Sequence, residues 1–169
     1  MTTAFLVLRM YLGDFRYREV PFDEILDEVS SGAAPAGLLI HEGQLTYGDY
    51  DLVKSVDLGE WWLLETGLPL PLGVNVARRD LGEDTLHELS EVLHESIEVG
   101  LANRRRAMSY AMQFGRGLDR TRTDRFVGMY VNGLTLDYGE RGREAVRRLL
   151  DDSQAAGLLP KPVEVEFAS

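Results

Sequence analysis

The sequence predicts an α/β fold, in which helices and strands alternate up to about residue 78 and helices dominate afterwards. Two patterns of apolar residues indicate this fold. In several early segments the apolar residues alternate or run continuously, as they do in strands, and elsewhere they recur at helical spacing. The 169 residues suit one ordinary domain, or one lobe and part of another.

Three helices are expected in the first part of the chain, over residues 3–12, 21–31 and 58–66. For the first of them, Thr2 or Thr3 is a suitable N-cap and Gly13 is a suitable stop. The second helix carries a proline and two acidic residues in its opening turn, and Gly32 ends it.

Five short segments have the apolar patterns of strands: residues 15–20, 37–40, 52–56, 74–77 and 163–167. The run Gly-Leu-Leu-Ile at 37–40 is typical of a strand that is buried on both faces of a parallel sheet. Residues 68–73 read Leu-Pro-Leu-Pro-Leu-Gly, and prolines in this register fit neither a helix interior nor a central strand. This segment is therefore expected to be a connector.

Four further helices are expected, over residues 83–101, 104–114, 123–131 and 140–156. Arginine is frequent in the last three of them. Solvated helix faces are the favoured interpretation of these arginines. An RNA-binding stripe is the other, but the segment lacks interleaved aromatic residues in a recognisable motif.

Composition argues against several classes of protein and site. The chain has no cysteine, which excludes disulfides, thiolate nucleophiles and sulfur ligands for metals. A net charge of −10 argues against nucleic acids and anionic membranes as partners. No apolar run reaches the roughly 18 residues that a membrane span needs, and no basic segment marks a signal peptide. The cytoplasm is the expected compartment.

His41 is the first candidate for a functional residue. It follows the expected strand at 37–40 directly, and ligands bind at the carboxyl ends of strands in open α/β sheets. Histidine is also the side chain best suited to exchanging protons near neutral pH. A histidine that only caps the strand or hydrogen-bonds within a loop is an equally open interpretation. His87 and His94 lie seven residues apart on one helix, a spacing that does not favour a metal site.

The run Thr2-Thr3-Ala4 is the second candidate. The first N–H groups of a helix have no intrahelical partner and can hold a carboxylate or a phosphate. Plain capping of the helix by threonine is the alternative, and the sequence alone favours it.

Several motifs together resemble those of the 1,4-dihydroxy-6-naphthoate synthases of the futalosine route to menaquinone. They are Thr2-Thr3-Ala4, Gly37-Leu38-Leu39-Ile40-His41-Glu42-Gly43, Asp57-Leu58-Gly59-Glu60-Trp61-Trp62, the proline segment 66–73, Arg78-Arg79-Asp80-Leu81-Gly82, Tyr130-Val131-Asn132 and Asp137-Tyr138-Gly139-Glu140-Arg141-Gly142. The resemblance runs in order from residue 2 to about residue 159.

The resemblance implies a fold like that of the type II periplasmic binding proteins, with one lobe present and the C-terminal part of the other. Residues 1–70 would form most of the second lobe. Residues 71–169 would form the return connector and the helical end of the first lobe. The family's leading region, of about a hundred residues, has no counterpart here, so a shortened chain that is inactive by itself is expected.

The resemblance also implies a lyase that converts cyclic dehypoxanthine futalosine to 1,4-dihydroxy-6-naphthoate. His41 matches the family's proposed proton acceptor, and Thr3 and Ala4 match residues that contact the substrate. No metal or organic cofactor is implied, and the expected partner is a small molecule. Two alternatives stay open: a non-catalytic protein that binds aromatic carboxylates, and a half protein completed by a separate chain.

Overall fold

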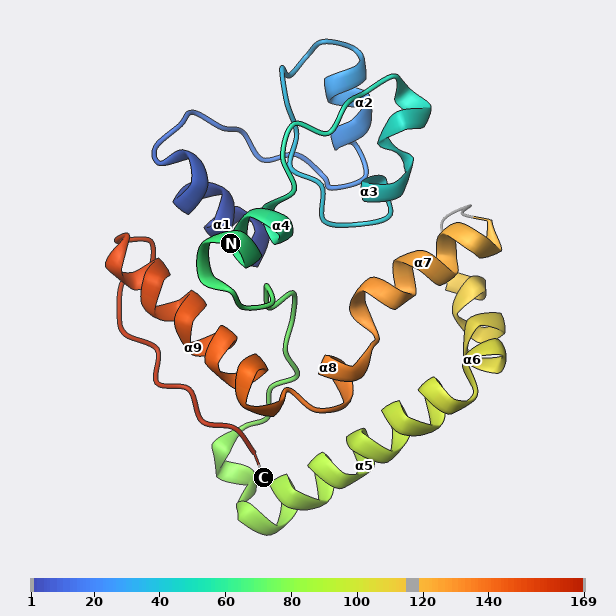
Figure 1. The fold of residues 1–169 in the computed structure, drawn as a ribbon, viewed down its shortest axis with the longest axis vertical. Helices are drawn as coiled ribbons and strands as arrows, with labels where there is room; N and C mark the ends of the chain where they lie inside the picture. The colour runs from blue at the N-terminus through green and yellow to red at the C-terminus, as the bar shows by residue number, and fades with distance from the viewer. Residues whose placement is uncertain (1, 115–118, 169) are drawn as a thin grey trace.

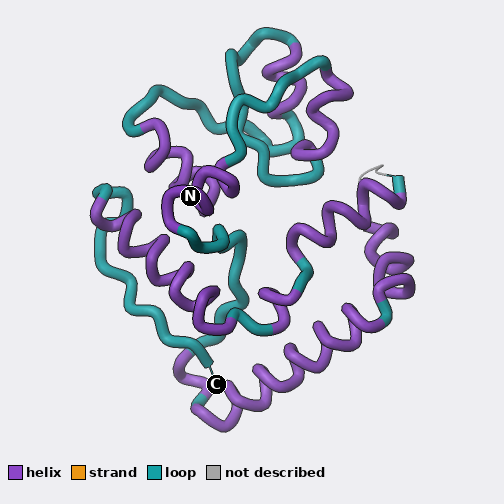
Figure 2. Tube along the Cα trace, in the orientation of Figure 1, coloured by secondary structure: helices purple, strands orange, loops and turns teal. Residues whose placement is uncertain are grey.

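The computed structural model describes residues 2–114 and 119–168, and its regular elements are all helical (Figure 1, Figure 2). The helices of the described chain are α1 (Thr3–Leu12), α2 (Ile25–Ser30), α3 (Gly43–Thr46), η1 (Tyr47–Tyr50), α4 (Leu58–Thr66), η2 (Arg79–Leu81), α5 (Glu83–Ala102), α6 (Arg104–Ala111), η3 (Met112–Phe114), α7 (Arg120–Tyr130), α8 (Gly133–Leu136) and α9 (Gly139–Ala155). The expected α/β fold of the type II periplasmic-binding-protein kind is therefore wrong for this structure.

The five expected strands are extended or irregular segments instead, and none of the described residues belongs to a strand. A strand forms only where backbone N–H and C=O groups pair with a neighbouring strand. Figure 2 draws these segments in teal, as loops, and Val53 and Val76 within them are 85% and 88% exposed. The apolar pattern of these segments is not sufficient for strands, because the neighbouring strand that pairing requires is absent from the described chain.

The segment 37–40 packs against a helix. A Cβ atom placed on Gly37 would lie 2.4 Å from Cγ2 of Ile25 and 3.0 Å from Cγ2 of Val29, so the chain passes α2 at a distance that only glycine allows. Ile40, at the end of the run, is 38% exposed. The expectation of a strand buried on both faces is wrong for this reason.

The ends of α1 and α4 follow from their capping residues. The Thr2 hydroxyl accepts a hydrogen bond from the Phe5 N–H at 3.2 Å, and Asp57 Oδ1 accepts from the N–H groups of Gly59 and Glu60 at 3.0 and 3.2 Å. Both helices end at a glycine with a positive φ angle, which only glycine adopts without strain. The predicted bounds of these two helices are confirmed.

The main core lies where α1, α4 and α9 meet (Figure 1). Val7, Trp62 and Leu149 contribute one side chain from each helix, and they are 0%, 1% and 5% exposed. On α9 the buried positions recur every three or four residues, as on any helix with one apolar face. The core therefore joins the beginning of the chain to its last helix.

The helices from α5 to α8 form an arch away from this core (Figure 1). α5 runs along the lower edge in this view, α6 and α7 turn back, and α7 reaches toward the α2–α3 region. No described residue of α5 is buried, and apolar side chains on it such as Val92 and Val99 are 64% and 54% exposed. The chain then returns through α8 and α9, and Glu166 in the tail forms an ion pair with Arg79 of η2. No helix in the described part of the chain is both long enough and apolar enough to cross a membrane.

Candidate functional site around His41

The imidazole of His41 is held at both ring nitrogens by the backbone. Nε2 lies 2.6 Å from the carbonyl oxygen of Phe22, and Nδ1 accepts a hydrogen bond from the Gly43 N–H at 3.0 Å. A carbonyl can only accept, so the proton of the neutral ring is on Nε2 and the lone pair is on Nδ1. The side chain is only 13% exposed. These contacts fix one tautomer and one orientation of the ring.

Gly43 allows the ring to take this position. A Cβ atom at residue 43 would lie 2.8 Å from Cε1 and 3.3 Å from Nδ1 of His41, and 3.3 Å from Cδ1 of Leu26. Real Cβ atoms essentially never approach another atom as closely as 2.8 Å. Glycine is therefore the only residue type at position 43 that leaves room for the imidazole of His41.

Two further groups surround the ring. The Phe22 ring meets it edge to face, with the ring centroids 5.1 Å apart. A carboxylate oxygen of Glu42 lies 3.9 Å from Nδ1, and both side chains are largely buried. A protonated imidazole here would have a carboxylate beside it.

Tyr130, at the C-terminal end of α7, contacts the same segment from the other half of the chain. Its hydroxyl donates to the carbonyl oxygen of Ile40 at 2.9 Å and accepts from Nε2 of Gln44 at 3.1 Å. Tyr130 lies in one of the family motifs, Tyr130-Val131-Asn132, but the motif alone implies no function for it. Gln44 adjoins another of these motifs, and the only signal that could have found it was its closeness to His41.

A second connection from α7 reaches η1. The guanidinium of Arg122 donates to both carboxylate oxygens of Asp49, at 2.5 and 3.1 Å. These hydrogen bonds lower the pKa of Asp49 and raise the pKa of Arg122. α7 is thus connected to the His41 segment through Tyr130 and to η1 through Arg122.

Thr3 and Ala4 lie in the first turn of α1, and both are half-buried. The N-cap is Thr2, and the first backbone hydrogen bond of the helix joins the Leu6 N–H to the Thr2 carbonyl at 3.0 Å. The N–H groups of Thr3 and Ala4 precede that bond and are the donors a helix leaves for a ligand. Since Thr2 performs the capping, the Thr3 hydroxyl is not needed for it.

The two candidate groups contact different elements. α1 packs against α4 and α9, whereas His41 contacts Phe22 and lies in the segment that α7 touches (Figure 1). His87 and His94 are exposed on α5, and His87 lies 3.6 Å from a carboxylate oxygen of Glu91. In the part of the chain that the structure describes, no group of three or more acidic or histidine side chains is arranged to hold a metal ion.

Comparison with known proteins identifies the family. A family model described as "Menaquinone biosynthesis" matches residues 1–155. A Thermus thermophilus protein named 1,4-dihydroxy-6-naphthoate synthase is 43% identical over 167 residues, and one of the same name from Streptomyces coelicolor is 38% identical over 165 residues. The matches cover 97% and 94% of this chain, but only 61% and 58% of the relatives.

The backbone of this chain has the same fold as part of an Archaeoglobus fulgidus protein whose crystal structure is known. The TM-score is 0.89 at 44% sequence identity, over 94% of this chain and 60% of that one. The backbone path of this chain is therefore shared with 60% of a solved structure. Together with the family model and the two named relatives, these matches show that the chain belongs to the menaquinone biosynthesis family.

Proposed function

We propose that this chain belongs to a lyase that converts cyclic dehypoxanthine futalosine to 1,4-dihydroxy-6-naphthoate, with His41 as the proton acceptor. Family membership and the two relatives of that name support the reaction. The observation that carries the role of His41 is its fixed tautomer, with Nε2–H bonded to the Phe22 carbonyl and the lone pair on Nδ1.

Nδ1 is the atom that would take the proton. In the present arrangement its lone pair accepts the Gly43 N–H at 3.0 Å, so a substrate proton has to replace that hydrogen bond. Glu42, with a carboxylate oxygen 3.9 Å away, would then stabilise the positive imidazolium. Removal of a proton near a carbonyl, followed by elimination, produces the aromatic ring of the product.

The N-terminus of α1 is proposed to hold the aromatic carboxylate of the substrate. The N–H groups of Thr3 and Ala4 precede the first intrahelical hydrogen bond, and a helix N-terminus carries a partial positive charge. The arrangement needs no metal or organic cofactor. The Thr3 hydroxyl, which is not required for capping, would be a further donor to the ligand.

The wider setting of the reaction is also a proposal. The chain spans 61% and 58% of its two named relatives, so the activity of those relatives is proposed for it and not taken over as shown. The proposal also includes a division of the chain at residue 70. Residues 1–70 would form one unit, and residues 71–169 would form the connector and the later helices. A small-molecule substrate is proposed from the family assignment. A cytoplasmic location is likewise proposed, from the sequence alone.

The direct test is product formation by the protein purified from its native source. The protein is incubated with cyclic dehypoxanthine futalosine, and 1,4-dihydroxy-6-naphthoate is measured by liquid chromatography. Calorimetry with the same naphthoate measures binding in parallel. Turnover supports the proposal. Binding without any turnover contradicts it, and would favour a non-catalytic protein that binds aromatic carboxylates.

A further inference from the structure

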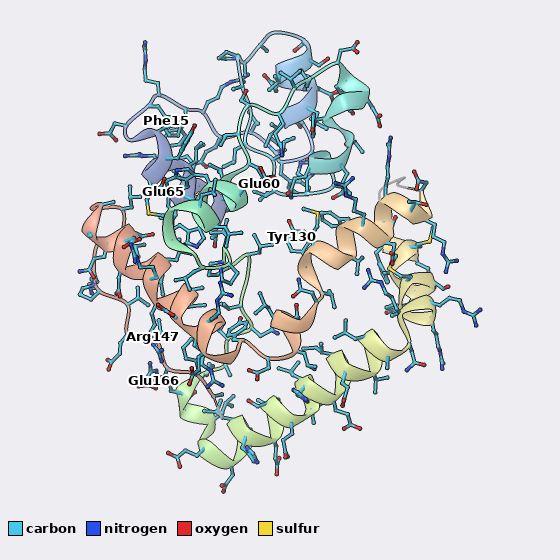
Figure 3. The ribbon with its side chains drawn as sticks, in the orientation of Figure 1. Phe15, Glu60, Glu65, Tyr130, Arg147 and Glu166 are labelled. Atoms are coloured by element: carbon cyan, nitrogen blue, oxygen red, sulfur yellow. The ribbon has the colours of Figure 1, made fainter. Side chains whose placement is uncertain are left out.

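Tyr130 connects α7 to the residues on both sides of His41. Its hydroxyl donates to the Ile40 carbonyl at 2.9 Å and accepts from the Gln44 side chain at 3.1 Å. Ile40 directly precedes His41, and Gln44 follows it by three residues. In Figure 3 Tyr130 is labelled at the end of α7 that lies nearer the centre of the molecule. The Tyr130 hydroxyl is thus hydrogen-bonded to the backbone of Ile40, before His41, and to the side chain of Gln44, after it.

Gln44 continues this connection back to His41. Its backbone N–H donates to the carbonyl oxygen of His41 at 2.9 Å, while its side chain donates to Tyr130. The imidazole is in turn bonded to the N–H of Gly43, which precedes Gln44. A shift of the Tyr130 hydroxyl would therefore move both ends of the short turn that carries the ring.

Such a turn gains from external support because it is short. α3 has four residues, the side chain of its N-cap residue Glu42 makes no capping hydrogen bond, and the segment before it is irregular. The hydrogen bond from Tyr130 gives the Ile40 carbonyl a donor, which in a sheet would come from a neighbouring strand. The Tyr130 side chain itself is half-buried, which restricts its rotamers.

We propose that Tyr130 is a positioning residue for His41: its hydroxyl, together with the Gln44 side chain, keeps the imidazole in the orientation that leaves the lone pair on Nδ1. The effect of Tyr130 on catalysis rests on the proposed function, in which His41 is the base. The positioning of the ring does not rest on it, because the tautomer and orientation of His41 can be measured without substrate.

The measurement is nitrogen-15 NMR of the histidine rings in wild-type protein and in Tyr130→Phe. In the wild type we expect the tautomer with the proton on Nε2. Removing the hydroxyl should release Ile40 and Gln44, and give His41 a mixture of the two neutral tautomers. An unchanged His41 spectrum in a folded Tyr130→Phe protein would overturn the proposal.

Two further variants keep the test decisive. Gln44→Leu removes the hydrogen bond from the Gln44 side chain to the Tyr130 hydroxyl and should shift the His41 signals in the same direction. This variant tests the proposal even if Tyr130→Phe does not fold. Arg122→Gln breaks the separate contact of α7 with Asp49 and should leave the His41 tautomer unchanged. A Gln44→Leu protein with the wild-type signals, or an Arg122→Gln protein with altered ones, would contradict a specific role for Tyr130.

The rate of product formation provides a second readout. Displacement of a catalytic group by about 1 Å can cost on the order of 100-fold in rate. Tyr130→Phe should lower kcat by roughly 10- to 100-fold while KM changes little, because Tyr130 orients the base. A loss confined to KM would overturn the positioning role. If His41→Ala instead retained the full rate, the proposed function would fail while the NMR result would still stand.

Discussion

The hydroxyl of Tyr130 lies 2.9 Å from the carbonyl oxygen of Ile40, although ninety residues separate the two in the sequence. The contact makes the geometry at His41 depend on α7, a helix of the arch that shares no part of the main core at α1, α4 and α9. Motion of the arch relative to that core would therefore reach the imidazole through the hydrogen bonds of the Tyr130 hydroxyl to Ile40 and Gln44.

Gly43→Ala tests the close approach of the imidazole to the backbone. The new Cβ atom would lie 2.8 Å from Cε1 of His41, so the ring has to leave its position. We expect a loss of about 1–3 kcal/mol in the free energy of unfolding, measured by urea denaturation, and altered His41 signals in the NMR spectrum. Gly48→Ala is the matched control, since nothing lies within 4 Å of its Cβ position. Equal effects of the two substitutions would contradict the account.

Thr2→Ala and Thr3→Ala separate helix capping from ligand binding at α1. The Thr2 hydroxyl accepts from the Phe5 N–H, so its loss should lower the free energy of unfolding by about 1 kcal/mol. Thr3→Ala should change it by less than about 0.5 kcal/mol, yet weaken the binding of 1,4-dihydroxy-6-naphthoate in calorimetry. Unchanged affinity in the Thr3 variant would remove its hydroxyl from the site.

Asp49 should titrate below its ordinary pKa of 3.8, because it accepts two hydrogen bonds from Arg122. A lowered pKa in the folded state means that the folded protein binds this proton less tightly than the unfolded chain. The contact between α7 and η1 is then fully present above pH 3.8 and is lost as the pH falls through the lowered pKa.

Carbon-13 NMR of the Asp49 carboxyl group follows that titration. In Arg122→Gln the midpoint should rise toward 3.8, since the cause of the shift is gone. A wild-type midpoint at or above 3.8 would contradict the ion pair.

Trp62→Ala should be the most destabilising of these substitutions. Trp62 is 1% exposed between Val7 and Leu149, and truncating such a side chain costs about 3–5 kcal/mol. Leu64, two residues along α4, is 85% exposed, and Leu64→Ala should cost less than about 0.5 kcal/mol. Thermal or urea unfolding of the two variants distinguishes them. Similar losses would mean that α4 does not pack through Trp62.

Local signals in the sequence were sufficient for the bounds of α1 and α4, whereas the expected helix at 21–31 is shorter in the structure and the short helices α3, η1, η2 and α8 were not predicted. Thr2 and Gly13 bracket α1 as predicted, and Asp57 and Gly67 bracket α4 in the same way. Such capping depends only on residues within one or two turns, so it can be read without knowledge of the rest of the chain.

The strands were predicted wrongly because strand formation is not a local property. The apolar run at 37–40 is real, but its backbone finds α2 and Tyr130 as neighbours and no second strand. The same limit applies to the site. His41 was identified from its neighbours in the sequence, whereas Tyr130 reaches the residues beside it, Ile40 and Gln44, from far along the chain. No pattern of spacing predicts those contacts.

The rate of 1,4-dihydroxy-6-naphthoate formation in His41→Ala tests the central claim most directly. The substitution is made in the gene of the source organism, so that the natural protein is compared with its wild type. Loss of the proton acceptor should lower turnover by roughly 10²–10⁴-fold, while His87→Ala, on the exposed face of α5, should leave it unchanged. A His41→Ala protein that works at the wild-type rate would show that this imidazole is not the base.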